Sequence, residues 1–223
     1  MHLLVAGGNG FIGRQVCRRA VEAGHEVTSV ARSGPPGPEH RGDWAGEVSW
    51  VAADVFAPHE YREHLAGVDT AVHSIGIIEE YPEQGVTFER VNGDAGILVA
   101  LEAERAGVDR FVYVSSSTTP PTVRDAYIEA KRRAEAALAD LELETVVLRP
   151  GPVYGPDQPH FPTLLNRLLA AVGRFEVVAR QFGTDRPLSV ETVGQAVYAC
   201  AVGEETGDEG TGRLDGPDIA AYR

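Results

Sequence analysis

The chain has 223 residues, of which 43% are hydrophobic and 24% charged, a composition typical of a soluble globular protein with one substantial core. Its 33 acidic and 20 basic residues give a formal net charge of -13, which argues against nucleic acid and anionic lipid as partners, because both need a basic surface. Neither an apolar stretch of about 18 residues nor a charged-then-apolar leader occurs, so the sequence predicts no membrane span, no signal peptide and a cytoplasmic location.

The types of basic residue and the positions of the cysteines indicate the kind of genome and the redox compartment of this protein. Lys131 is the only lysine among the 20 basic residues, a bias typical of a high-GC genome, and the acidic excess leaves a salt-adapted source open. Cys17 and Cys200 lie in no metal-ligand or redox spacing, so both are predicted to be thiols in a reducing compartment. His59 and His64 are five residues apart, which does not place them on one helical face, and no metal site is predicted.

Short apolar runs alternate with helical patterns along the first two thirds of the chain. Strands are predicted at His2–Ala6, Glu26–Ala31, Val48–Ala52, Asp69–His73, Arg110–Ser115 and Glu144–Arg149. Helices are predicted at Gly10–Ala23, near His59–Ala66, at about Thr87–Ala106 and at Arg124–Leu141, with a loop at Ser33–Gly46. Strands that alternate with helices imply a parallel sheet covered on both faces, so the predicted fold class is α/β, a Rossmann-type doubly wound sheet.

The pattern changes after Pro150. A proline- and glycine-rich loop, GPVYGPDQPHFP, is followed by predicted helices at Thr163–Val172 and Thr192–Val202, and the acidic tail GEETGDEGTG is predicted to be exposed. These segments suit a small lobe over the strand ends better than a second core. We therefore predict a single domain over residues 1–223, in which residues 151–223 contribute a small substrate-side lobe.

The opening sequence MHLLVAGGNGFIG contains three evenly spaced glycines, Gly7, Gly10 and Gly13. In a chain with 25 glycines this spacing alone is weak evidence, but here a predicted strand precedes it and a predicted helix follows. That arrangement binds dinucleotides: the first glycine permits a tight turn, the second lets the backbone approach the pyrophosphate, and the third lets helix and strand pack closely. Phe11 and Ile12 lie at the helix N-terminus, whose free N–H groups favour phosphate, so all five residues are predicted to bind the cofactor.

The ends of the next two strands indicate which dinucleotide binds. The second strand ends in Val30-Ala31-Arg32-Ser33, where no acidic residue is present to bind the 2′-hydroxyl of NAD, whereas Arg32 can pair with the 2′-phosphate of NADP. The sequence favours NADP(H); NAD stays open, and a solvated surface arginine is the alternative interpretation. Asp54, followed by Val55, ends the third strand, where its carboxylate can accept from the adenine amino group or cap a turn. These residues make the predicted domain NAD(P)-binding.

Tyr127 and Lys131 are four residues apart on a predicted helix, so both side chains lie on one face. With seven tyrosines and one lysine in 223 residues, chance gives this spacing in about 3% of cases (7/223). A tyrosine is a weak acid–base catalyst at its ordinary pKa of about 10, and a neighbouring ammonium favours the phenolate and lowers that pKa. The pair is therefore predicted to move a proton and to hold ribose hydroxyls.

Several motifs occur in a recognisable order over nearly the whole chain: GGNGFIG, Asp54-Val55, HSIG at residues 73–76, FVYVSSS, YIEAK and LRPGPVYGP. In this order they resemble the short-chain dehydrogenase/reductase family, in particular its extended and atypical branches. Those branches include NAD-dependent epimerases and dehydratases, related reductases and the nucleotide-binding accessory subunit of respiratory complex I. The resemblance implies that Tyr127 is the general acid/base and that Lys131 binds the nicotinamide ribose and lowers the pKa of the tyrosine.

The same resemblance assigns the remaining site residues. It implies that a serine at the end of the fifth strand polarises a substrate carbonyl; Ser116 is the first choice and Ser117 the second. Asn92 matches a family asparagine that supports the fifth-strand region, with a plain helix-surface residue as the alternative. Pairing through the long helices, which is common in the family, implies a homodimer. The residues implied to line the cofactor after the fourth and sixth strands are His73, Ser74, Ile75, Gly76, Pro150 and Val153.

Two departures from the family pattern leave the substrate class open. Tyr127 lies only ten positions after Ser117, and the sequence ends at GPDIAAYR, where extended members continue into further substrate-binding structure. Both leave little room for a nucleotide-sugar. The first hypothesis is an NADP(H)-dependent oxidoreductase or epimerase that acts on a small molecule at a carbonyl or hydroxyl carbon. The second is a non-catalytic NAD(P)H-binding sensor or assembly subunit; the Ser/Tyr/Lys set favours the first, because a pure binder has no need of a tuned phenol.

Overall fold

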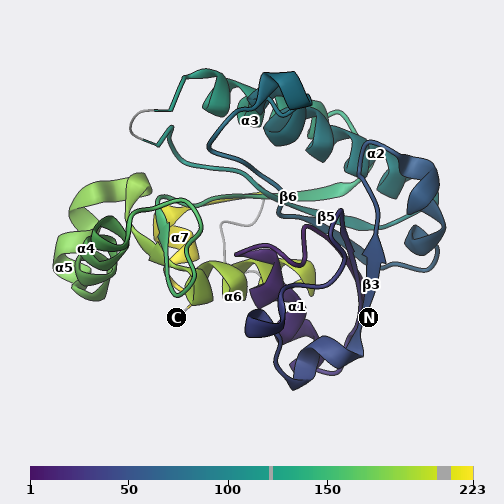
Figure 1. Ribbon diagram of the computed structural model, residues 1–223, viewed down its shortest axis with the longest axis horizontal. Coiled ribbons are helices and arrows are strands. Elements are labelled where there is room, and N and C mark those ends of the chain that lie inside the picture. Colours follow the sequence, from purple (N-terminus) through teal and green to yellow (C-terminus); the bar gives the residue numbers. More distant parts are fainter. Residues whose placement is uncertain (121–122, 205–211, 223) are drawn as a thin grey trace.

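A parallel sheet forms the centre of the structure (Figure 1). In the computed structural model, which describes residues 1–120, 123–204 and 212–222, seven strands of this sheet lie in the order β3-β2-β1-β4-β5-β6-β9. Every neighbouring pair is parallel. The arrangement confirms the predicted α/β fold, a Rossmann-type doubly wound sheet. The strands are β1 (His2–Ala6), β2 (Glu26–Ala31), β3 (Val48–Ala52), β4 (Thr70–His73), β5 (Arg110–Val114), β6 (Glu144–Arg149) and β9 (Arg213–Asp215).

Helices cover both faces of the sheet (Figure 1). One face carries α1 (Gly13–Glu22) and α6 (Val190–Ala201), and the other carries α2 (Ala95–Ala106) and α3 (Ala126–Leu138). Leu3 and Val5 of β1 pack into the core under α1 and α6, whereas Leu4 packs into the core under α2 and α3. Successive residues of one strand therefore enter opposite cores, and this is why β1 is apolar throughout instead of alternating with polar residues.

The strand order reverses between β1 and β4. From β1 the chain runs outward through β2 and β3, then returns to the other side of β1 to form β4, β5 and β6. The loops after β1 and β4 therefore diverge and open a crevice at the carboxyl ends of the strands. Ser74, the first residue after β4, donates its N–H to the carbonyl of Ala6 at 2.9 Å and its hydroxyl to the same oxygen at 3.1 Å, which ties the two strand ends together.

Two predicted helices take a different form. The helix predicted near His59–Ala66 is a pair of short turns, because the buried residues Tyr61 and Leu65 provide too small an apolar face for a regular amphipathic helix. The helix predicted at Thr87–Ala106 begins with a π-helical turn, a form that is frequent at functional sites, before it continues as α2. These and the other short turns are η1 (Pro38–His40), η2 (Asp43–Glu47), η3 (Pro58–Glu60), η4 (Arg62–Leu65), η5 (Pro82–Gln84) and η6 (Glu89–Asp94).

The segment after Pro150 divides between the central sheet and a small lobe. A two-stranded sheet of β7 and β8, together with α4, α5 and η7, forms the lobe, which lies to one side of the central helices (Figure 1). In contrast, α6 packs on the central sheet and β9 pairs with β6, so residues 151–223 do not all belong to the lobe. Residues 205–211 of the predicted acidic tail lie outside the described residues. The elements are β7 (Val153–Tyr154), α4 (Thr163–Arg174), α5 (Glu176–Ala179), η7 (Arg180–Asp185), β8 (Leu188–Ser189) and α7 (Gly216–Ile219).

The contact between α1 and β1 can be tested with one methyl group. A Cβ atom added at Gly13 would lie 2.1 Å from the carbonyl oxygen of Gly7, whereas a Cβ at Gly46 would meet nothing within 4 Å. We expect Gly13→Ala to lower the free energy of unfolding by about 1–3 kcal/mol, the usual cost of overpacking. The matched change Gly46→Ala is expected to alter it by less than about 1 kcal/mol. Urea unfolding of the two variants measures both values, and equal effects would contradict the packing role of Gly13.

Candidate cofactor and active site

A cavity of about 920 Å³ opens at the carboxyl ends of the central strands, where the strand order reverses. It is bounded by the loops that follow β1 to β6 and by α4 of the lobe. A space of this size is at the upper end of the range for cofactor sites in proteins. The predicted site residues that line it are Gly7, Gly10, Phe11, Ile12, Arg32, Asp54, Val55, Ser74, Ile75, Gly76, Ser116, Tyr127, Lys131, Pro150 and Val153.

The turn after β1 has the geometry of a phosphate-binding turn. Gly7 has a φ of 86°, in the left-handed region, and donates its N–H to the carbonyl of Val30 at 2.9 Å. Gly10 donates to the carbonyl of Gly7 at 2.9 Å, which closes the turn. Gly13 does not line the cavity; it lets α1 approach Gly7, because a side chain there would collide with the Gly7 carbonyl.

The start of α1 faces the cavity without a competing side chain. Its N-cap residue is Ile12, which cannot cap the helix; no side chain of the described residues caps it, and its first turn contains no acidic residue. The backbone N–H groups at this end, together with the partial positive charge of the helix, suit a pyrophosphate group. The residues present therefore fit a dinucleotide.

The adenosine side of the cavity is formed by the ends of β2 and β3. Arg32 is exposed and lines the cavity, and within the described part of the chain its guanidinium has no ion-pair partner. Asp54 also lines the cavity, but one of its carboxylate oxygens accepts the N–H of Phe56 at 3.0 Å. Asp54 thus caps a turn and faces the cavity at the same time, so the two interpretations of this residue are compatible.

Two residues on this side were missed by sequence reasoning. Asn9 donates from its amide to the hydroxyl of Ser33 at 2.7 Å and to the carbonyl of Gly34 at 3.0 Å, which holds the loop after β2 against the glycine turn. Arg90 of η6 stacks on the ring of Phe56, with 3.9 Å from its guanidinium carbon to the ring centroid. The presence of Asn9 in a glycine-rich turn could have indicated its contact with the loop after β2. The contact between Arg90 and Phe56 joins segments that are distant in the sequence, so no local pattern predicts it.

Tyr127 and Ser116 meet in the cavity wall. Tyr127 is 9% exposed, packs edge-on against the ring of Phe88 at 5.7 Å, and lines the cavity. Burial raises the pKa of its phenol above the ordinary value, while a hydrogen bond with Ser116 and the positive charge of Arg132 act to lower it. The net direction corrects the expectation that Lys131 would lower this pKa: the tyrosine is held neutral by its apolar surroundings.

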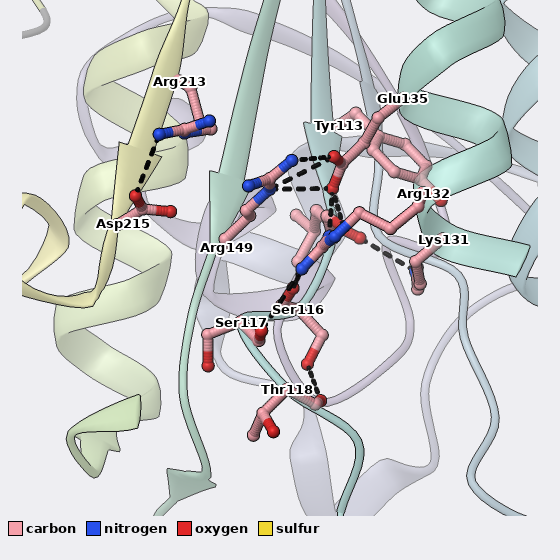
Figure 2. A network of polar contacts seen from close by, with 12 residues as sticks. Tyr113, Ser116, Ser117, Thr118, Lys131, Arg132, Glu135, Arg149, Arg213 and Asp215 are labelled. Carbon is pink, nitrogen blue, oxygen red and sulfur yellow. Dashed lines mark hydrogen bonds and ion pairs between the residues drawn. The ribbon is translucent and has the colours of Figure 1, made fainter. Parts of the chain in front are cut away.

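Lys131 is fully buried and turns its ammonium group toward the backbone. Its Nζ donates to the carbonyl of Val114 at 2.9 Å and lies 5.0 Å from the ring centroid of Tyr113 (Figure 2). Burial lowers the pKa of Lys131 to about 8, although the charge of Glu135 acts to raise it. A Cβ atom at Gly76 would lie 3.6 Å from this ammonium, which places Lys131 beside the loop that follows β4.

The three serines after β5 have three different environments. Ser115 donates its hydroxyl to Glu135, and the buried hydroxyl of the half-buried Ser117 has no hydrogen-bond partner among the described residues. Ser116 lines the cavity together with Tyr127 and donates its hydroxyl to the carbonyl of Thr118 at 2.8 Å. Of the two serines considered from the sequence, Ser116 lines the cavity and Ser117 does not.

An ionic network that the sequence analysis did not identify holds these serines (Figure 2). Glu135 of α3 lies between Arg132 of the same helix, 2.5 Å away, and Arg149 at the end of β6, which bonds both of its carboxylate oxygens. Arg132 also donates to the backbone carbonyl of Ser116 at 2.8 Å. Burial acts to raise the pKa of Glu135, but hydrogen bonds from Arg149 and Ser115 outweigh it and hold the pKa below its ordinary value. The network therefore positions the backbone around Ser116.

Asn92 and His73 support the site from behind. Asn92 is fully buried and is not a helix-surface residue: its side chain accepts the N–H of Ile77 at 2.8 Å and donates to the Ile77 carbonyl at 3.0 Å. Its own carbonyl accepts the hydroxyl of Tyr113 in β5 at 2.8 Å. His73 was expected to line the cofactor, but its ring stacks on Tyr113 at 5.4 Å and does not line the cavity. Burial lowers the pKa of His73 to about 3, so it is neutral.

Metal-binding clusters and membrane-spanning helices are both absent from the described residues. Among the described residues, histidine, cysteine and acidic side chains do not gather into a group of three or more that could hold a metal ion. In the same residues no helix combines the length and the apolar character needed to cross a membrane. Cys17 and Cys200 are both buried and are not joined by a disulfide, and burial raises the pKa of Cys17 to about 12.

Comparisons with known proteins agree with this geometry. Residues 3–181 match the model of the NAD dependent epimerase/dehydratase family. The chain is 31% identical over 197 residues to MIOREX complex component 2 of Saccharomyces cerevisiae, covering 67% of this chain and 71% of that protein. It is 27% identical over 227 residues to 2-alkyl-3-oxoalkanoate reductase of Shewanella oneidensis, covering 89% of this chain and 55% of that protein. The chain thus spans about half the length of this reductase.

The structure is also similar to solved structures. One is MoeE5 in complex with UDP-glucuronic acid and NAD, with a TM-score of 0.70, 24% sequence identity, and coverage of 96% of this chain and 75% of that chain. At this level of identity the likeness shows the fold alone.

Because Lys131 is buried, the free energy of unfolding is expected to depend on pH. The pKa of Lys131 is about 8 in the folded protein and about 10.5 in the unfolded chain, so between these values only the unfolded state keeps the proton. The free energy of unfolding should therefore rise with pH in this window, and the gain is lost as the pH falls through 8. Relative to Lys131→Met, the wild type should gain up to about 3 kcal/mol between pH 7 and pH 10. Urea unfolding at pH 7, 8, 9 and 10 measures the difference; parallel curves would contradict the assignment.

Proposed function

Since the chain belongs to the NAD dependent epimerase/dehydratase family, we propose that it is an oxidoreductase that uses NADP(H) and acts at a carbonyl or hydroxyl carbon through Ser116, Tyr127 and Lys131. One observation carries the proposal: these three side chains line the same cavity as the uncapped start of α1. A proton donor, a carbonyl-polarising hydroxyl and a dinucleotide site are thus within one space. The similarity to a protein named as a reductase is consistent with it.

The cofactor would be held by residues of the crevice. The N–H groups at the start of α1 would bind the pyrophosphate, Arg32 the 2′-phosphate, and Lys131 the nicotinamide ribose. When bound, the dinucleotide supplies or accepts the hydride. NAD is the alternative if Arg32 stays in solvent.

Tyr127 and Ser116 would act on one substrate oxygen. The hydroxyl of Ser116 would turn from the Thr118 carbonyl to donate a hydrogen bond to that oxygen and so polarise the substrate carbonyl. The phenol of Tyr127 would transfer its proton to the same oxygen. Because burial raises the pKa of Tyr127, the phenol is protonated at neutral pH, which suits carbonyl reduction. The Arg132–Glu135–Arg149 network positions Ser116 through its backbone carbonyl.

A second candidate function is non-catalytic binding of NAD(P)H, as in a sensor or an assembly subunit. The observation that favours it is the orientation of Lys131, whose ammonium is bonded to Val114 and not to the phenol. The similarity to a protein named as a component of a complex is consistent with it.

The cofactor assignment predicts a preference for NADPH. We expect NADPH to bind more tightly than NADH by about 1–3 kcal/mol, the range of a charge-assisted contact. Arg32→Ala should remove most of this gap and leave NADH binding nearly unchanged. Arg180→Ala is the matched control, because Arg180 is 75% exposed and lies away from the cavity. Fluorescence titration measures both affinities, and equal values in the wild type would overturn the NADP assignment.

The catalytic assignment predicts a selective effect of one hydroxyl. Tyr127→Phe keeps the ring, so folding and NADPH affinity should survive, while turnover of a carbonyl substrate should fall about 10²- to 10⁴-fold. Tyr81→Phe makes the same change at a side chain that is 51% exposed and outside the cavity, and it should have no effect. Steady-state kinetics with NADPH test this. Full turnover by Tyr127→Phe would refute the catalytic role, and firm NADPH binding without turnover of any carbonyl compound would favour the non-catalytic candidate.

A further inference from the structure

Six apolar side chains line the cavity around Tyr127 and α4, beside the polar residues Gln158 and His160. Ile77 and Ile78, from the loop after β4, pack with Tyr127 and Phe88 in a small cluster of their own. The opposite wall comes from the lobe, where a phenylalanine and two leucines point at the same space. The apolar residues that line this part are Ile77, Ile78, Val86, Phe161, Leu165 and Leu169.

Positive charge is concentrated elsewhere in the cavity. In the described part of the chain, its cationic lining residues are Arg32, Arg90 and Lys131, besides the imidazole of His160. Arg32 ends β2, Arg90 stacks on Phe56 after β3, and the ammonium of Lys131 is bonded to Val114. The lining residues that come from α4 and the loop before it are Gln158, Pro159, His160, Phe161, Leu165 and Leu169. None of them is an arginine or a lysine, so this segment offers no guanidinium or ammonium to a diphosphate, which is recognised by such groups.

The apolar lining continues to the surface along α4. Leu165 lines the cavity and is nevertheless 40% exposed, so the cavity opens at this helix. Its neighbours Leu164 and Leu168 are 81% and 59% exposed. Of these three leucines only Leu165 lines the cavity, so a molecule that extends out of the cavity here passes the side chain of Leu165.

We propose that the substrate is a ketone or secondary alcohol that carries a hydrocarbon chain and no diphosphate, with the chain packed between the isoleucines after β4 and the leucines of α4. This inference rests on the proposed function, because Tyr127 must act on the oxygen at the inner end of the chain. In the reduction, the carbonyl carbon receives a hydride with its two electrons from NADPH, which becomes NADP⁺. The carbonyl oxygen receives the proton of the Tyr127 hydroxyl, which is replaced from solvent, and the product is the secondary alcohol.

A series of methyl ketones tests the proposal: 2-butanone, 2-hexanone, 2-octanone and 2-decanone, each with NADPH. If the chain enters the apolar part, kcat/KM should rise about fourfold for each added methylene, as expected for burial of that group, until the cavity is filled. UDP-glucose with NADP⁺ or NAD⁺ is the contrasting substrate. We expect no turnover of it.

Two neighbouring leucines provide matched variants. Leu165→Gln should reduce the dependence on chain length several-fold, because Leu165 lines the cavity, whereas Leu164→Gln should leave it unchanged. Both side chains are partly or largely exposed, so neither change is expected to unfold the protein, and melting temperatures check this.

The outcomes separate this inference from the proposed function. A flat chain-length series, equal effects of the two leucine variants, or turnover of UDP-glucose would overturn the apolar substrate class while Tyr127→Phe still abolishes turnover. If no ketone is reduced, calorimetric titration of the matching 2-alkanols into the protein with NADP⁺ decides the point. Affinity that rises with chain length in the wild type and not in Leu165→Gln would then support the apolar site although the catalytic proposal had failed.

Discussion

The close contact between Gly7 and Gly13 is the constraint on which the cofactor site depends. The carbonyl oxygen of Gly7 lies where the side chain of any other residue at position 13 would begin. This contact seats the start of α1 against the end of β1 and so directs the N–H groups of the helix into the crevice where the strand order reverses. Because β2 and β4 both pair with β1, the loops that carry Arg32 and Ser74 are placed relative to the same point.

On the active-site side of the cavity, ion pairs hold the backbone in place, in contrast to the close backbone packing around Gly7. A half-buried carboxylate must be paired to remain ionised, and Glu135 meets this requirement with arginines from α3 and β6. Arg132, which lies 16 positions after Ser116, also donates to the carbonyl of Ser116, and Arg149, 33 positions after Ser116, acts on this segment only through Glu135. If Arg132 or Arg149 were removed, the carboxylate of Glu135 would lose one of its ion-pair partners. The position of the segment around Ser116 therefore depends on an intact ionic network.

Burial connects the chemistry of Tyr127 to the character of the space beside it. The apolar residues that keep water from the phenol also raise its pKa, and Ile77 and Ile78 belong both to this environment and to the cavity lining. The same burial lowers the pKa of Lys131, whose ammonium takes the Val114 carbonyl as its acceptor. The burial of this region therefore both keeps the phenol of Tyr127 neutral and lowers the pKa of Lys131.

The sequence by itself determined the fold class and the family, and most of the residues that it predicted for the site do line the cavity. The strand–turn–helix pattern around Gly7 and the four-residue spacing of Tyr127 and Lys131 are local, and local periodicity reports directly which face of an element is buried. Tertiary structure alone decided that Ser116 and not Ser117 lines the cavity, that the pKa of Tyr127 is raised, and that His73 turns away from the cavity. It also decided the π-turn before α2, the pairing of β9 with β6 and the ionic network around Glu135. Each of these features depends on contacts between residues that are distant in the sequence and on how deeply those residues are buried. The spacing of residues along one helix or strand does not report such long-range contacts, so the sequence pattern could not predict them.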